Sequence, residues 1–425
     1  MRNHAKTINQ KFYYGWLIVL TSAIAMFFSA PGQTFSVSVF IDAYGETFDY
    51  SSTLISTGYS VATVISGSLI VFMGRLVDKF GHRVMMVVVG ILLALTTFYN
   101  SFVANIGMMF VGFFLLRYFG QGSMTLLPES LVPQWFDKRR GFALSIMGLG
   151  ITVATLLVPR YNLFLIDQFG WQGAWRVWSL MLLLILVPMA FFFVINRPEK
   201  IGITIENAHN GNKKAADEAY KAMMDESFTL KEAVKTRQFW FVGLMSMIGP
   251  MFTTGVTFHF FSIMALRGVE RETSAFIIGL IAVPAFIMPL IARSVVDRLP
   301  FKVTFLIIQT IFMLSMVWLA FAVTGAPSAT FFILFYGIGF TLLNVTMNAM
   351  WPSYFGRAYL GAIRGAGTVF MVIGSALGAL PFGVSYDVTG NYNAAIFVMM
   401  GMTGVAMVLA SLLRKPQKHV QSLTE

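Results

Sequence analysis

Three ionisable side chains lie deep within long apolar stretches of the sequence: Arg117, Glu129 and His259. Charged groups inside a bilayer are costly and usually serve a function. An arginine supplies a permanent cation, a carboxylate withdrawn from water can carry a proton, and a histidine can titrate near neutral pH. These residues are therefore the first candidates for binding and coupling chemistry.

Arg117 begins a polar stripe on one predicted helix. Gln121 and Thr125 follow at i+4 and i+8, so the three side chains share a face. Arg117 stands about 10 residues, or ~15 Å, into its apolar segment. We expect this face to line a wet central cavity in which Arg117 attracts an anionic substrate or couples to proton movement. The alternative is an arginine bonded to backbone carbonyls of neighbouring helices.

Glu129 lies further along the same apolar segment. One interpretation is a proton-coupling site, because a carboxylate removed from water binds a proton more readily. The other is an inner gate, in which Glu129 pairs with Lys138, Arg139 or Arg364.

His259 stands among phenylalanines, where it either contributes to substrate binding and proton coupling or packs as an aromatic side chain. Gly249 and Pro250 predict a break in the same helix, and Thr257 is polar near it. Two further sets of polar residues are candidates for substrate binding or for hydrogen bonds between helices: Gln33, and the pair Asn344 and Asn348 at i,i+4 spacing.

Several kinds of chemistry are excluded or disfavoured. The chain has no cysteine, which removes disulfides, thiol catalysis and cysteine-based metal sites. No Walker loop occurs, and no paired carboxylates, Ser/His pair or His-rich face is grouped in the apolar segments. We therefore expect no enzyme activity, no cofactor and no metal site, and energy from an ion or substrate gradient.

The elements that position these residues are predicted to be membrane spans. The 425 residues are 57% hydrophobic and only 12% charged, which leaves too little polar surface for a soluble globule. Because a span needs roughly 20 apolar residues, the apolar runs predict twelve spans, at about 13–40, 50–73, 83–103, 107–132, 140–163, 174–195, 239–266, 273–293, 301–323, 328–352, 361–384 and 392–413.

The net charge of +11 follows the membrane topology. If both termini lie in the cytoplasm, the predicted cytoplasmic segments hold all but five of the 30 lysines and arginines. The five are Arg117, Arg160, Arg176, Arg267 and Arg271. This distribution is the positive-inside pattern of a multi-pass protein of the cell membrane. The basic charge is therefore explained by insertion into the lipid bilayer, and it does not indicate a nucleic-acid partner.

An internal repeat divides the chain. Residues 117–136 match residues 336–355 at an offset of 219, with a shared Pro followed by an aromatic pair two residues later. The repeat predicts two pseudo-symmetric six-helix bundles, residues 1–195 and 239–425. Residues 196–238 form the predicted cytoplasmic linker, in which Thr229 to Glu232 has the pattern of a capping box opening a short amphipathic helix.

The segment GRLVDKFGHR at residues 74–83 lies between the second and third spans. It resembles the hallmark loop of the major facilitator superfamily, and the resemblance covers essentially the whole chain. In that family the loop pairs with the start of the eleventh helix and braces the outward-open state. The resemblance implies gating roles for the loop and for its degraded second copy: Gly74, Arg75, Asp78, Gly81, Arg83, Asp297, Arg298 and Arg364.

Two further segments, YGW at residues 14–16 and WFDKRRGFA at residues 135–143, resemble the monocarboxylate and oxalate/formate transporter branch. That branch holds an arginine deep in the eighth helix, where this chain has Pro289. We expect a secondary transporter, acting as a monomer on a small molecule with protons or a counter-substrate. The first hypothesis is proton-coupled movement of a small organic anion, in particular a carboxylate; the alternative is efflux of hydrophobic or amphipathic compounds.

Overall fold

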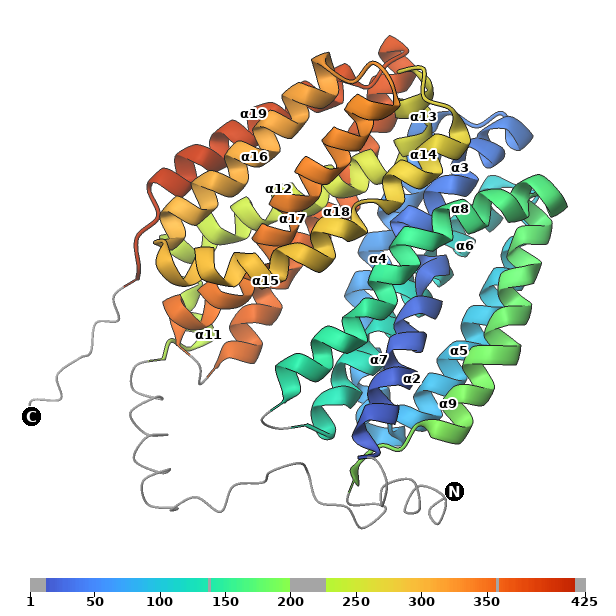
Figure 1. Cartoon of the computed structure of the whole chain (residues 1–425), viewed down its shortest axis with the longest axis horizontal. Helices are drawn as coiled ribbons and strands as arrows, with labels where there is room; N and C mark the ends of the chain where they lie inside the picture. The colour runs from blue at the N-terminus through green and yellow to red at the C-terminus, as the bar shows by residue number, and fades with distance from the viewer. Residues whose placement is uncertain (1–12, 137–138, 199–226, 357–358, 417–425) are drawn as a thin grey trace, which may run out of the picture.

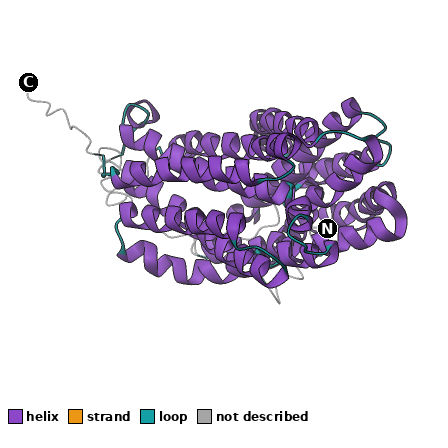
Figure 2. Cartoon of the chain, turned by 90° about the horizontal axis from the view of Figure 1, so that it is seen from above, coloured by secondary structure: helices purple, strands orange, loops and turns teal. Residues whose placement is uncertain are grey.

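The computed structural model describes residues 13–136, 139–198, 227–356 and 359–416. Over these ranges the chain forms helices and short connections and contains no strand, as Figure 2 shows. The structure thus confirms an all-helical membrane protein. Because lipid offers no hydrogen bonds to the backbone, apolar segments of this length are stable across a bilayer as helices.

The helices of the first half follow the first six predicted spans. Their bounds are α2 Gly15–Phe28, η1 Ala30–Gly32, α3 Thr34–Phe48, α4 Ser52–Phe80, α5 His82–Asn100, α6 Ile106–Leu115, η2 Leu116–Ser123, α7 Met124–Leu131, η3 Val132–Gln134, α8 Arg140–Met181, η4 Leu182–Leu186 and α9 Val187–Phe193.

The helices of the second half follow the remaining six. Their bounds are α11 Leu230–Ala233, α12 Arg237–Phe258, α13 Phe260–Ala265, α14 Arg271–Gly279, α15 Ala282–Arg298, α16 Phe301–Phe321, α17 Ala326–Phe355, α18 Leu360–Thr389 and α19 Asn393–Ser411.

Ten helical stretches of the described chain are long and apolar enough to cross a membrane. One of them, Arg140–Phe193, is bent at Gly170, whose φ of 68° is not helical, and so accounts for two crossings. The span that holds Arg117 is not among the ten; it consists of α6, η2 and α7, and its polar residues lower its mean hydropathy. The twelve predicted crossings are therefore all present.

The two halves of the chain lie side by side. Figure 1 shows the blue to green helices α2 to α9 on one side and the yellow to red helices α11 to α19 on the other. The halves contact each other through α4 with α18, α3 with α12 and α13, and α8 with α14. At one such contact a methyl group on Gly279 would lie 2.6 Å from the Leu156 carbonyl oxygen, so glycine permits close packing of α14 on α8.

The predicted capping box is confirmed. Thr229 accepts a hydrogen bond from the backbone N–H of Glu232, and the Glu232 carboxylate accepts one from the backbone N–H of Thr229. The resulting helix α11 is a single turn that precedes α12. The domain limits at residues 195 and 239 stay predictions, and most of the linker, residues 199–226, lies outside the described residues.

Candidate functional site

A cavity of about 620 Å³ lies between the two halves. Its wall is built from both, with α4, η2 and α8 from the first half and α12, α15 and α18 from the second. Six predicted site residues line it: Gln33, Arg117, Gln121, Thr125, Glu129 and Thr257. The polar stripe expected on the fourth span therefore faces the cavity.

Two irregular segments position Arg117. The first span breaks at Pro31 and Gly32, and the extended backbone of Gln33 (φ −83°, ψ 146°) starts the new helix α3. Opposite this break, the fourth span loosens into the π-helical segment η2. A methyl group on Gly32 would lie 2.2 Å from the Leu116 carbonyl oxygen, so only glycine allows the two segments to meet this closely.

The Arg117 side chain is 4% exposed and is held by neutral groups. Its Nη1 lies 3.5 Å from the Gly32 carbonyl oxygen and 3.4 Å from Thr34 Oγ1, and its guanidinium carbon lies 5.0 Å from the centre of the Tyr59 ring. Its Nε–H is buried without a hydrogen-bond partner. Among the described residues, no carboxylate forms an ion pair with this cation.

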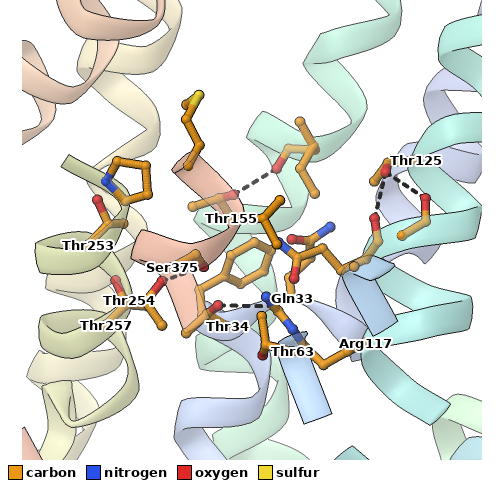
Figure 3. A pocket seen from close by; sticks show the side chains of 18 of the residues that line it. Gln33, Thr34, Thr63, Arg117, Thr125, Thr155, Thr253, Thr254, Thr257 and Ser375 are labelled. Atoms are coloured by element: carbon orange, nitrogen blue, oxygen red, sulfur yellow. Dashed lines mark hydrogen bonds between the residues drawn. The ribbon is translucent and has the colours of Figure 1, made fainter. Parts of the chain in front are cut away.

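Hydroxyl groups dominate the remaining polar lining. Thr253, Thr254 and Thr257 come from α12, and Thr254 Oγ1 lies 2.8 Å from Ser375 Oγ on α18. Figure 3 shows these residues across the cavity from Arg117, whose guanidinium is joined to Thr34 by a dashed line. Among the described residues of the lining, the two charged ones, Arg117 and Glu129, come from the first half.

Glu129 is exposed to the cavity, although it lies within an apolar span. The protein around this carboxylate withdraws it from bulk water, as the sequence suggested, while part of the side chain is exposed to the cavity. Arg364 lies within electrostatic range of it, and Arg364 also donates a hydrogen bond to the Asn348 side-chain oxygen. The arginine thus joins α18 to α17 close to Glu129.

Three predicted binding residues lie outside the lining. His259 is 3% exposed, with Nε2 3.0 Å from Ser56 Oγ and 3.2 Å from the Ala379 carbonyl oxygen, so it is packed between α4 and α18. Asn344 donates to the Phe340 carbonyl oxygen one turn earlier in its own helix. Asn348 accepts from Arg364 as described above. Hydrogen bonds between and within helices explain these polar groups.

Residues 74–83 form the last turns of α4, the connecting Gly81 and the start of α5, and they are bonded to the end of the first half. The Arg83 backbone N–H donates to Asn196 Oδ1 over 2.8 Å, and Arg83 Nε donates to the Phe191 carbonyl oxygen over 2.9 Å. Gly81 has a φ of 84°, and a methyl group there would lie 2.1 Å from Asn196 Nδ2. Glycine is therefore required at this turn.

The other predicted gating residues make fewer contacts. Arg75 stacks on Phe72, while a methyl group on Gly74 would meet nothing within 4 Å. Arg298 is exposed at the end of α15, and the side chain of Asp297 lies outside the described part of the chain. Asp78 forms no hydrogen bond to α18 in the part of the chain that the structure describes.

Sequence reasoning missed several lining hydroxyls, namely Thr34, Thr63, Ser66, Thr152, Thr155, Thr368 and Ser375. Most bond to a carbonyl of their own helix, as Thr155 does to Ile151 over 2.8 Å. A serine or threonine in a span can bond to its own helix in this way wherever the span lies. A single such residue therefore carries no signal for a cavity, and only their convergence does.

A cavity lined by both halves of a helical membrane protein is the arrangement of a secondary transporter, whose substrate site lies between its two repeats. The chain belongs to the Major Facilitator Superfamily, which it matches over residues 22–379. Its family and its named relatives are transporters, so the protein is a transporter and not an enzyme.

Relatives within the family are named for different substrates. The glucose transporter GlcP of Staphylococcus epidermidis is 22% identical over 386 residues, which covers 83% of this chain and 83% of that protein. Monocarboxylate transporter 9 of Mus musculus is 27% identical over 160 residues, or 38% of this chain and 31% of that protein. A solved bacterial homologue of the human lysosomal transporter Spinster superposes with a TM-score of 0.69 at 12% identity, covering 94% of each chain.

Proposed function

We propose that this protein is a secondary active transporter that moves a small organic anion, in particular a carboxylate, across the cell membrane by alternating access. The single observation behind this proposal is Arg117, a buried cation beside the cavity. A buried charge without an ionic partner is costly, and a carboxylate fits the planar donors of a guanidinium. Binding of an anion would supply the missing charge and satisfy the Nε–H.

Protons or a counter-substrate provide the energy in this proposal. Glu129 is the candidate for proton coupling because it is the one carboxylate among the described lining residues and its side chain is exposed to the cavity. Its nearness to Arg364 fits an alternative role as an inner gate. The protein acts as a monomer with both termini in the cytoplasm, an orientation that rests on the positive-inside pattern.

Efflux of hydrophobic or amphipathic compounds is the second candidate function. It is favoured by the lining residues that the structure describes in the second half, which carry no charge and include Phe340, Met371 and Val372. The two proposals differ in what Arg117 does. In efflux of neutral compounds the guanidinium has only a structural role.

A ligand screen separates the two. Purified protein is heated with a panel of mono- and dicarboxylates and a matched panel of neutral and cationic drugs, and the shift in melting temperature is measured. We expect carboxylates to stabilise the parent and to have no effect on Arg117→Gln. Stabilisation by drugs alone would support efflux.

A further inference from the structure

The ends of α4 and α18 meet away from the predicted cytoplasmic side. Asp387, near the end of α18, accepts hydrogen bonds from the backbone N–H groups of Ser52, over 3.2 Å, and Thr53, over 2.7 Å. These residues begin α4, and the first N–H groups of a helix have no partner within it. The carboxylate also faces the positive end of the helix dipole. A residue of the second half thus caps a helix of the first.

Neighbouring contacts close the same end. A methyl group on Gly383, one turn before Asp387, would lie 2.7 Å from the Ser52 carbonyl oxygen, so α18 and α4 touch along their backbones. One turn further along α4, Ser56 contacts His259 of the second half. Arg271 at the start of α14 donates to the Val39 carbonyl oxygen of α3 over 3.2 Å. Several helices of the two halves are therefore bonded here.

The opposite ends of the same two helices are not joined in this way. Asp78, near the end of α4, makes no hydrogen bond to α18 among the described residues. Methyl groups on Gly74 of α4 and on Gly365 of α18 would meet nothing within 4 Å. The helices α4 and α18 run antiparallel, so the last turn of each lies beside the start of the other. Each carries a carboxylate near that last turn, Asp78 in α4 and Asp387 in α18. Within the described residues, only the carboxylate of α18 is bonded to its partner helix in this conformation.

We propose that Asp387 is the outer latch of the transporter, holding the outer end shut while the cavity is open to the cytoplasm, and releasing α4 when the halves rock. It is the counterpart, at the other end of the same helix pair, of the loop around Asp78. This inference rests on the alternating access and the orientation proposed above. It does not depend on the identity of the substrate.

Ring contacts connect the latch to the cavity. Arg117 stacks on Tyr59, whose ring centre lies 4.4 Å from that of Phe258. The next residue, His259, contacts Ser56 of α4. Ser56 lies one turn after the start of α4, where Asp387 caps the helix. These contacts form a continuous packed connection between Arg117 and the helix start that Asp387 caps.

The test measures the two ends separately, and the absence of cysteine from the sequence allows spin labels to be placed without a background. One pair, Glu46→Cys and Thr389→Cys, reports on the outer end. The other pair, Lys79→Cys and Ser353→Cys, reports on the opposite end. All four positions are exposed, and each pair joins the two halves. Distances are measured by double electron–electron resonance on the full chain in nanodiscs without substrate.

We expect Asp387→Ala to raise the outward-open population about 5-fold, the order expected for the loss of one helix cap. The outer distance lengthens while the inner distance shortens. Asp78→Asn, whose carboxylate belongs to the opposite latch, should shift both distances the other way. Asp167→Asn is the control, since it removes an exposed carboxylate next to the bend of α8 at Gly170 that has no hydrogen bond among the described residues.

Unchanged distances in Asp387→Ala would overturn the latch, and so would broadening of both pairs together, which indicates a structural role. If Asp387→Ala does not fold, Asp387→Asn replaces it. Its amide oxygen still accepts one hydrogen bond, so a smaller shift in the same direction is expected, and no shift overturns the proposal. Because no substrate is present, failure of the anion hypothesis would leave these distances unaffected.

Discussion

At the scale of single residues, Arg117 is the strongest candidate for contact with a ligand, because it is a buried cation with no ionic partner among the described residues. Neutral oxygens and one aromatic ring surround the guanidinium, and one donor has no partner. Glu129, in the same span, differs because water reaches it. The two residues therefore make separable predictions, one for binding and one for coupling.

Replacement of Arg117 should weaken anion binding. Loss of a charge-assisted contact in a partly desolvated site costs roughly 1.5–3 kcal/mol, which is about 10- to 150-fold in affinity. Arg117→Lys should restore part of the affinity and Arg117→Gln hardly any, because lysine lacks the planar donor pair. Calorimetry on monodisperse protein measures this.

The control is Arg160→Gln, which removes an exposed arginine from the same half but outside the central cavity. It should bind as the parent does. Equal affinities in the parent and in both Arg117 variants would show that Arg117 is structural.

Replacement of Glu129 should separate coupling from translocation. In Glu129→Gln the side chain keeps its size but cannot carry a proton, so proton-driven accumulation in proteoliposomes should fall at least about 10-fold, while exchange of internal for external substrate persists. If Glu129 is instead an inner gate paired with Arg364, exchange should slow as well. Accumulation at the parent rate would remove Glu129 from coupling.

At the scale of the elements, breaks in helices build the site. In the first span α2 ends at Phe28 and α3 begins at Thr34, with Pro31 and Gly32 in the turn between them, and the fourth span loosens opposite this break. Helix breaks are tolerated at membrane depth where protein or a cavity satisfies the freed backbone. Here one of the freed carbonyls, that of Gly32, faces Arg117.

Gly32→Ala tests this arrangement. The added methyl group would lie 2.2 Å from a backbone oxygen, which a helix can relieve only by moving. We expect a loss of about 1–3 kcal/mol in stability, seen as a lower melting temperature, together with weaker anion binding because Arg117 is displaced. Gly45→Ala in the following helix α3 is the matched control, since nothing lies within 4 Å of its new methyl group. A Gly32→Ala protein as stable as this control would contradict the close contact.

At the scale of the whole molecule, transport requires the two halves to rock about the cavity. The segment around Asp78, at the end of α4, is bonded to its own half through Arg83, which contacts Asn196 and Phe191. These bonds fix its position relative to the first half. In the family that the sequence resembles, this loop braces the outward-open state.

Asp78→Asn should therefore leave the protein folded but slow its turnover, roughly 10-fold for a typical change in conformational equilibrium. One exposed loop charge contributes little to stability. The measurements are the melting temperature and the transport rate in proteoliposomes, with Asp167→Asn alongside. A transport rate equal to that of the parent would exclude Asp78 from gating.

The sequence by itself determined the number of spans, the internal repeat, the capping box at Thr229 and the cavity-facing stripe from Arg117 to Thr125. Each of these depends on local composition or on spacing along one helix, which the chain carries wherever it folds. Only the tertiary structure decided that His259 is packed between α4 and α18, that Glu129 is exposed, and that Asp387 caps α4. Rotation of a helix about its axis and the choice of its neighbours depend on packing between distant segments, so no pattern within one span could specify these positions.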